Sequence, residues 1–132
     1  MDMKVKTIMT ACPYKVDAET TLEKGLETMN LYNIRHLPVT QGEDLLGVVT
    51  LPSIKLANAI CESLQYCPQI GEICSEDPYI VNQDTSLSEL ANEMAEKKLE
   101  YALVQNQDNE LVGIVTTTDL CKAMHRILEG QN

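Results

Sequence analysis

The sequence predicts an α+β fold built from two similar halves. The chain has 132 residues, of which 44% are hydrophobic and 23% are charged, a balance typical of a globular protein. The second half repeats the apolar pattern of the first at a spacing of 65 residues, and strand-like runs alternate with helix-like stripes in both. These observations predict two β-α-β-β-α units, residues 1–66 and 67–132, related by a pseudo-twofold axis and packed through their sheets into one compact module.

The repeat is visible in two pairs of segments. Pro13-Tyr14-Lys15-Val16 aligns with Pro78-Tyr79-Ile80-Val81 at an offset of 65 residues. Gly47-Val48-Val49-Thr50 aligns with Gly113-Ile114-Val115-Thr116 at an offset of 66, because the second half has one extra residue in its turn. Segments that stay in phase over this length indicate a duplicated unit.

Each half is expected to contain a helix that starts at a capping box. Thr20 with Glu23, and Ser86 with Glu89, have the spacing at which a hydroxyl accepts from an amide and a carboxylate reaches back. Apolar residues then recur at helical spacing, which predicts one buried face per helix. They are Leu22, Leu26 and Met29 in the first half, and Leu87, Leu90, Ala91 and Met94 in the second.

A hairpin and a closing helix follow in each half. The predicted strands are residues 37–39 with 45–50 and residues 102–104 with 111–116, joined by polar turns. Pro52 suits the first turn of one closing helix, because its missing amide hydrogen is not needed there. Leu120, Met124, Ile127 and Leu128 form the stripe of the other. Residues 63–71 are expected to connect the units, which begin near Ile8 and Ile73.

Charge and hydropathy exclude several classes of function. The formal net charge is −10, from 10 basic and 20 acidic side chains, and an acidic surface repels nucleic-acid phosphates. The longest apolar runs are about five residues, too short to span a membrane. The first residues lack the apolar stretch of a secretion signal, so a cytoplasmic location is expected.

The five cysteines (Cys12, Cys61, Cys67, Cys74 and Cys121) are odd in number and lack C-x-x-C spacing. In a reducing compartment they are interpreted as small apolar residues. A metal or redox role for the cluster Cys61, Cys67 and Cys74 is the alternative. No ligand spacing links either histidine to the cysteines, so no metal site is predicted.

The duplicated pattern, with Gly113-Ile114-Val115-Thr116-Thr117-Thr118-Asp119-Leu120 at the end of a unit, resembles a tandem cystathionine-β-synthase (CBS) domain pair, or Bateman module. Arg35-His36-Leu37-Pro38-Val39 is similar to the family's second strand. The resemblance covers about residues 5 to 128. It implies a stand-alone regulatory module that binds an adenosine-containing ligand between the units, dimerises with a second copy and signals to an unknown effector protein by a conformational shift.

The resemblance also implies the site residues. Thr116 and Asp119 would face strands of the first unit, with Thr116 bonding a phosphate or sugar oxygen and Asp119 bridging two ribose hydroxyls. The ligand-binding set is Pro13, Tyr14, Lys15, Ile34, Arg35, His36, Thr116 and Asp119. The same two residues would also serve as a simple cap of the last helix. Residues 1–66 carry a net charge of −2 and residues 67–132 a net charge of −8, so the first unit is expected to bind the ligand's anionic part.

The related second site is expected to bind weakly or not at all. Ser53 stands where the family has an aspartate, and Glu100 replaces the charge of Arg35. The residues of this site are Tyr79, Ile80, Leu99, Glu100, Tyr101, Thr50 and Ser53. The expected ligands are AMP or ADP, then ATP, then S-adenosylmethionine, and no cofactor is required.

Two other classes of function remain as alternatives. A ligand-free dimerisation or interaction module would suit a family member whose sites have decayed. An enzyme is disfavoured, because Cys12 and His36, the only nucleophile and base considered, have no Gly-rich oxyanion turn or third orienting group. The orientation of two chains in a dimer, head-to-head or head-to-tail, stays open.

Overall fold

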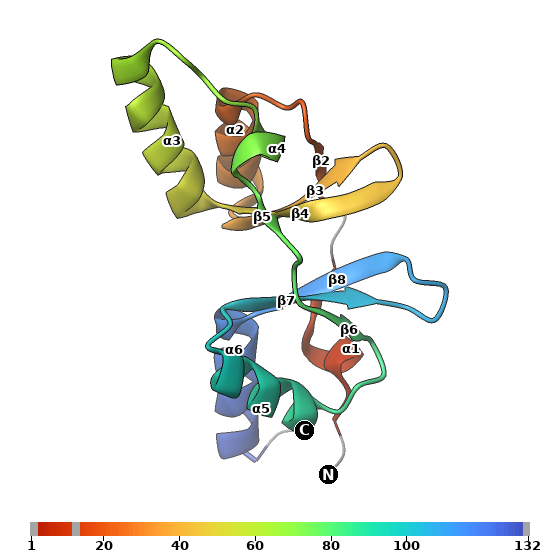
Figure 1. The fold of residues 1–132 in the computed structure, drawn as a ribbon. Helices are drawn as coiled ribbons and strands as arrows, with labels where there is room; N and C mark the ends of the chain where they lie inside the picture. Colours follow the sequence, from red (N-terminus) through yellow and green to blue (C-terminus); the bar gives the residue numbers. More distant parts are fainter. Residues whose placement is uncertain (1–2, 12–13, 131–132) are drawn as a thin grey trace. The chain divides into compact units, whose positions relative to one another are not determined.

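The computed structural model describes residues 3–11 and 14–130 and contains two compact units (Figure 1). The central unit is Tyr14–Pro78, and the terminal unit joins residues 3–11 to residues 79–130. The units therefore differ from the contiguous halves 1–66 and 67–132. The family resemblance of each half is unaffected, because the difference lies in the short segment that precedes each repeat.

The central unit contains α2 (Leu22–Tyr32), α3 (Leu51–Leu64), α4 (Ile70–Ile73) and four strands. Over the described residues its sheet has the order β2 (Val16–Asp17), β3 (His36–Gln41), β4 (Asp44–Thr50) and β5 (Ser75–Glu76). The pair β2/β3 is parallel, and the other two are antiparallel. Side chains from the helices and the sheet form one core, which includes Met29, Leu37, Val39, Val49, Ile54 and Ile70.

The terminal unit has the same plan. Its helices are α1 (Val5–Ile8), α5 (Leu87–Lys97) and α6 (Thr117–Leu128). Its sheet has the order β1 (Thr10–Ala11), β8 (Leu111–Thr116), β7 (Tyr101–Gln105) and β6 (Ile80–Asn82) over the described residues. A second core lies between them and includes Val5, Leu90, Met94, Val104, Val115 and Ala123. The element bounds repeat at offsets of 65 up to β7 and 66 from the ends of β4 and β8, as the sequence predicts.

The segment before each repeat lies in the unit formed mainly by the other repeat. Helix α1 and strand β1 precede the first repeat, yet β1 pairs with β8; α4 and β5 precede the second repeat, yet β5 pairs with β4. In Figure 1 the red α1 lies with the blue and teal elements. The amide of Val5 donates to Thr85 O and that of Ile70 to Thr20 O, both at 2.9 Å. We call residues 3–11 and 70–76 the exchanged arms.

Several local expectations need correction. Helix α2 is capped by Thr21, which accepts from the amide of Lys24, so the Thr20/Glu23 box is one residue out of register. The cap of α5 is Ser86, as predicted, and Pro52 lies in the first turn of α3. Ala91 is exposed on α5 instead of buried.

The stripe expected on α6 is also largely exposed. Met124 is 61% exposed, Ile127 45% and Leu128 77%. Leu120 packs against the core, but the buried residues of α6 are Asp119 and Ala123. A buried aspartate at the start of a helix replaces part of the apolar face that the periodicity predicted.

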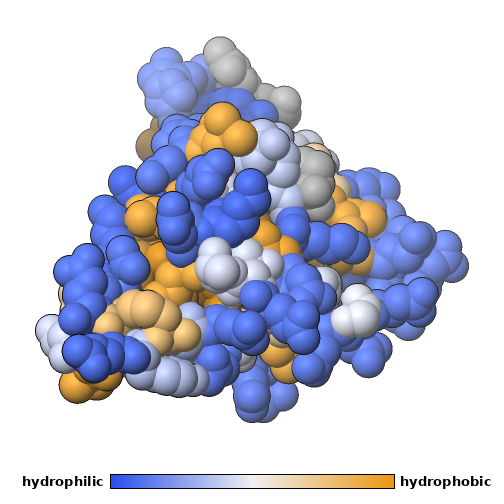
Figure 2. Space-filling model, turned by 90° about the horizontal axis from the view of Figure 1, so that it is seen from above, coloured by the Kyte–Doolittle hydropathy of each residue, from blue (hydrophilic) through white to orange (hydrophobic). Residues whose placement is uncertain are grey.

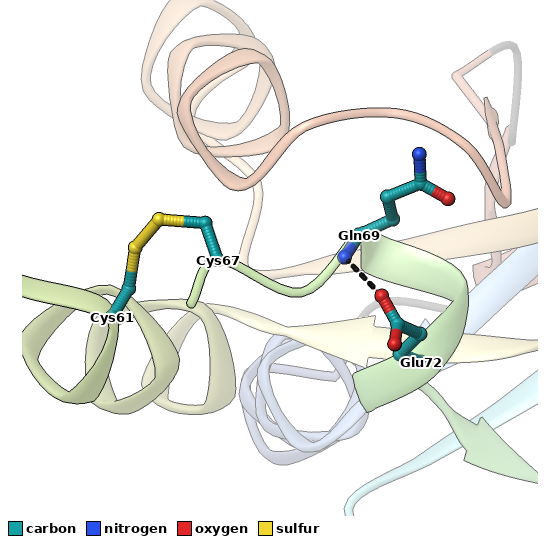
Figure 3. Close-up of a disulfide and its surroundings, with 4 residues drawn as sticks. All are labelled: Cys61, Cys67, Gln69 and Glu72. Carbon is teal, nitrogen blue, oxygen red and sulfur yellow. Dashed lines mark hydrogen bonds between the residues drawn. A yellow bond between two sulfur atoms is a disulfide. The ribbon is translucent and has the colours of Figure 1, made fainter. Parts of the chain in front are cut away.

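The cysteines also differ from expectation. Cys61 on α3 and Cys67, which precedes α4, form a disulfide with a Cα–Cα distance of 4.8 Å, so these two are not free apolar side chains (Figure 3). Next to it the amide of Gln69 donates to Glu72 Oε2 at 2.7 Å and starts α4. Cys74 is a partly buried free thiol whose pKa is raised by burial, and Cys121 is exposed. Cys12 lies outside the described residues.

Glycines at equivalent positions allow the exchanged arms to approach the sheets. A Cβ on Gly47 would overlap the backbone carbonyl of Ser75 in one arm. A Cβ on Gly113 would lie 2.9 Å from Thr10 O and 2.5 Å from Met9 Sδ in the other. The glycine of each G-apolar-apolar-T segment is therefore required by a neighbouring backbone.

We expect Gly47→Ala to lower the free energy of unfolding by about 2–3 kcal/mol, because backbone atoms of β4 and β5 must separate. Chemical denaturation measures the change. The control is Gly42→Ala, at a turn with φ +64° and nothing within 4 Å, which should cost about 1 kcal/mol through conformation alone. Equal losses for the two variants would contradict the packing explanation.

Candidate functional site

The first turn of α6 is organised around the carboxylate of Asp119. Strand β8 ends at Thr116, which is the N-cap of α6. The Thr116 amide donates to Asp119 Oδ2 at 2.8 Å, and the Thr116 hydroxyl lies 3.3 Å from the same oxygen. The predicted capping role of these residues is therefore confirmed, with the carboxylate as the acceptor.

The other carboxylate oxygen binds the exchanged arm. Thr10 on β1 donates from its hydroxyl to Asp119 Oδ1 at 2.9 Å, although 109 residues separate the two in sequence. Asp119 is only 8% exposed, and three donors compensate the burial of its charge. An ionised carboxylate offers about four acceptor positions, so one remains for a ligand hydroxyl.

Asp119 also lines an open pocket of about 710 Å³ in the terminal unit. The pocket lies between α1, which contributes Thr7 and Ile8, and α6. The residues from α6 are Thr118, Asp119, Cys121, Lys122, His125 and Arg126. Its volume is in the range of small-molecule sites. Thr10, Thr7 and the basic residues of α6 were not predicted as site residues.

The start of β7 lies beside this turn. Tyr101 is the register partner of Thr116, and the Thr117 amide donates to Glu100 O at 3.3 Å. Glu100 is exposed. Within the terminal unit the structure thus brings Glu100 and Tyr101, which were assigned to the second site, next to Thr116 and Asp119.

The central unit has the equivalent arrangement without a carboxylate. Thr50 caps α3, its hydroxyl accepts from the Ser53 amide at 3.3 Å, and it lies 3.0 Å from the Ser53 hydroxyl. His36 is the register partner of Thr50, and Arg35 O accepts from the Leu51 amide at 2.9 Å. Arg35 and His36, predicted for the main site, therefore lie beside Thr50 and Ser53 of the second.

The remaining predicted residues lie at the edges of the two cores. Tyr14 stacks on Tyr32 with ring centroids 3.8 Å apart, and Ile34 packs against the same core. Lys15 is exposed. Pro13 lies outside the described residues. That these side chains join Thr116 and Asp119 stays a prediction.

In the terminal unit, Tyr79 and Leu99 pack against the core, and Ile80 on β6 is 38% exposed. Lys97 Nζ lies 5.1 Å from the Tyr79 ring centroid. Burial, followed by the charge of Glu93, raises the pKa of Tyr79, while Lys97 opposes this shift. These contacts favour a structural role for Tyr79.

Two further classes of site were searched for in the described ranges. Residues 3–11 and 14–130 hold no group of three or more His, Cys, Asp or Glu side chains that could bind a metal ion. No helix in these ranges is long and apolar enough to cross a membrane.

Comparison with known proteins gives a consistent result. The CBS domain family matches residues 5–57 and 70–126. A CBS domain-containing protein of Dictyostelium discoideum is 24% identical over 140 residues, covering 98% of this chain and 96% of its own. The chain spans at most 45% of the other curated relatives reported, which include inosine-5'-monophosphate dehydrogenases.

Two solved structures resemble the fold. CBSX2 in complex with AMP has a TM-score of 0.77 and 25% identity, covering 94% of this chain and 97% of its own. The CBS domain pair of protein MJ0100, in complex with 5'-methylthioadenosine and S-adenosyl-L-methionine, has a TM-score of 0.79 and 21% identity, covering 95% and 98%. The second likeness concerns the fold alone. With both repeats matched and the tandem architecture shared, the chain belongs to the CBS domain family as a tandem CBS pair.

Proposed function

We propose that this CBS pair is a regulatory module that binds an adenosine-containing ligand at the first turn of α6. The observation that carries the proposal is the buried carboxylate of Asp119, which lines a pocket of about 710 Å³. The likeness to CBSX2, whose structure contains AMP, supports this class of ligand. The proposed role is sensing rather than catalysis.

The chemistry of the turn suits a nucleoside. A carboxylate only accepts hydrogen bonds, so Asp119 is matched to the hydroxyls of a ribose. The first amides of α6 point outward with the positive end of the helix dipole, which favours a phosphate nearby. The expected contribution of Tyr14, Lys15, Ile34, Arg35 and His36 is part of this proposal and rests on the family resemblance.

The second site, at Thr50 and Ser53, is proposed to bind more weakly. Its hydroxyls hydrogen-bond each other, and a serine cannot accept from two ribose hydroxyls as a carboxylate does. The difference between the two units lies in one side chain on a shared backbone framework.

Binding is proposed to act by shifting the population of conformations, which an effector protein then recognises. Asp119 joins the exchanged arm to α6 through Thr10, so a ligand that contacts this carboxylate also acts on the arm. The ligand must bind the two conformations with different affinities for any signal to follow.

The test exchanges the residues that distinguish the two units. Because Ser53 occupies the position of Asp119 and its amide bonds the cap residue, Asp119→Ser should preserve the helix start. We expect Asp119→Ser to weaken AMP binding at least about tenfold, since charge-assisted bonds to the ribose are lost. Isothermal calorimetry with AMP on both proteins measures this loss.

The reciprocal variant Ser53→Asp should strengthen binding at the second site, while Ser53→Ala should leave the affinity for AMP unchanged. Circular dichroism confirms that each variant is folded. If wild-type protein gives neither heat nor a thermal shift with AMP, ADP, ATP or S-adenosylmethionine, the sensor function is wrong and the ligand-free interaction module is favoured.

Self-association with a second copy is part of the proposal. Leu56, Ile60 and Leu64 recur every fourth residue on α3 and are 64%, 46% and 69% exposed. Figure 2 shows exposed apolar patches among hydrophilic residues on the face it presents. A continuous apolar helix face of this kind is typical of a subunit interface.

We expect Ile60→Glu to convert a dimer to a monomer in sedimentation velocity, because a charge would be buried without a partner. Glu62→Gln, an exposed change on the same helix, is the control. A monomeric wild-type protein at micromolar concentration, or a dimer that Ile60→Glu leaves intact, would contradict the assignment of this face.

A further inference from the structure

The pocket beside Asp119 carries a cluster of basic side chains in a strongly acidic chain. Lys122, His125 and Arg126 line it from α6, and the hydroxyls of Thr7 and Thr118 add hydrogen-bonding groups. The chain has a net charge of −10, so basic side chains gathered in one pocket are opposite in sign to the whole. Such a pocket attracts an anion.

Helix geometry arranges these cations in a row. Positions 122, 125 and 126 lie on one side of α6, because residues three and four apart are neighbours on a helix. At 1.5 Å per residue, Lys122 lies roughly 4.5 Å and Arg126 roughly 10 Å along the axis from Asp119. A row that starts one turn from a ribose-binding carboxylate suits the phosphates of a nucleotide.

The duplicated helix provides an internal comparison. At the offset of 66 residues, Lys122, His125 and Arg126 correspond to Leu56, Ala59 and Ile60 of α3. The same turn of the same element is therefore apolar in the central unit and basic in the terminal unit. The fold does not require charge at these positions, since α3 forms without it.

The positive charge is available to a ligand. The ion pairs that the structure shows within the described residues use Lys6, Lys24 and Lys97. The one acidic side chain lining the pocket, Asp119, already accepts from Thr10 and Thr116. Its charge is thus directed to the arm and the helix start rather than to Lys122 or Arg126.

We infer that the basic pocket binds the phosphate groups of the adenosine ligand, so that the ligand is an adenosine phosphate rather than 5'-methylthioadenosine or S-adenosylmethionine. This inference rests on the proposed function and deepens it. It moves the phosphate from Lys15, Arg35 and His36, where the sequence placed it, to α6. Ile8 provides an apolar floor between the cations and the core.

The experiment compares ligands that differ in phosphate. Calorimetry is run on wild-type protein with ATP, AMP, 5'-methylthioadenosine, S-adenosylmethionine and inorganic phosphate. We expect AMP to bind at least about tenfold more tightly than 5'-methylthioadenosine, and ATP at least as tightly as AMP, from charge-assisted bonds to Lys122 and its neighbours. Inorganic phosphate alone should bind weakly.

Two variants locate the effect. Lys122→Gln should weaken AMP about tenfold and leave 5'-methylthioadenosine unchanged, and Arg126→Gln should weaken ATP more than AMP. The control is Lys55→Gln, which removes one exposed charge from α3 and should change neither affinity. Glutamine is a good helix former, so folding is preserved in each variant.

The outcomes separate the inference from the proposed function. If 5'-methylthioadenosine binds wild-type protein as tightly as AMP, or if Lys122→Gln leaves AMP affinity unchanged, the phosphate site is wrong while adenosine binding stands. If inorganic phosphate binds as tightly as AMP, the pocket is a simple anion site and the inference is also overturned. If no adenosine compound binds, the proposed function itself fails.

Discussion

The interaction on which the account depends is the carboxylate of Asp119 receiving three hydrogen bonds. Two come from Thr116 and start α6, and one comes from Thr10 in the exchanged arm. A charge that is only 8% exposed needs such donors, because burying it unpaired would cost several kcal/mol. The same network fixes the carboxylate at the mouth of the pocket. Structure and proposed binding therefore share one side chain, and a ligand that bonds it also acts on the arm and the helix.

Duplication explains why the two units differ in chemistry but not in backbone. Gly47 and Gly113 accommodate the exchanged arms at equivalent positions, and Thr50 and Thr116 both cap the following helix. The changes fall on side chains that the framework does not need, with Ser53 opposite Asp119 and Ile60 opposite Arg126 in the alignment. A duplicated fold can thus keep its packing while one unit acquires a charged site and the other an exposed apolar helix face.

The sequence predicted the repeat, the second helix of each unit, the hairpins and the turn containing Thr116 and Asp119, because these depend on local periodicity and capping. It did not predict the exchanged arms, since pairing of β1 with β8 joins residues about a hundred positions apart and leaves no local pattern. For the same reason Thr10 was missed as a partner of Asp119. Lys122 and Arg126 resembled ordinary exposed charges until the pocket between α1 and α6 placed them beside Asp119. The disulfide of Cys61 and Cys67 was missed because spacing alone does not show that two cysteines face each other.

Amide chemical shifts of ¹⁵N-labelled protein during a titration with AMP test the central claim most directly, because each residue of the turn reports separately. The account predicts that the amides of residues 116–119 and of Thr10 shift most, followed by Lys122, while those of residues 50–53 move little at the same concentration. A titration in which residues 116–119 stay unchanged, or in which the largest shifts lie at residues 50–53, would contradict a ligand site centred on Asp119.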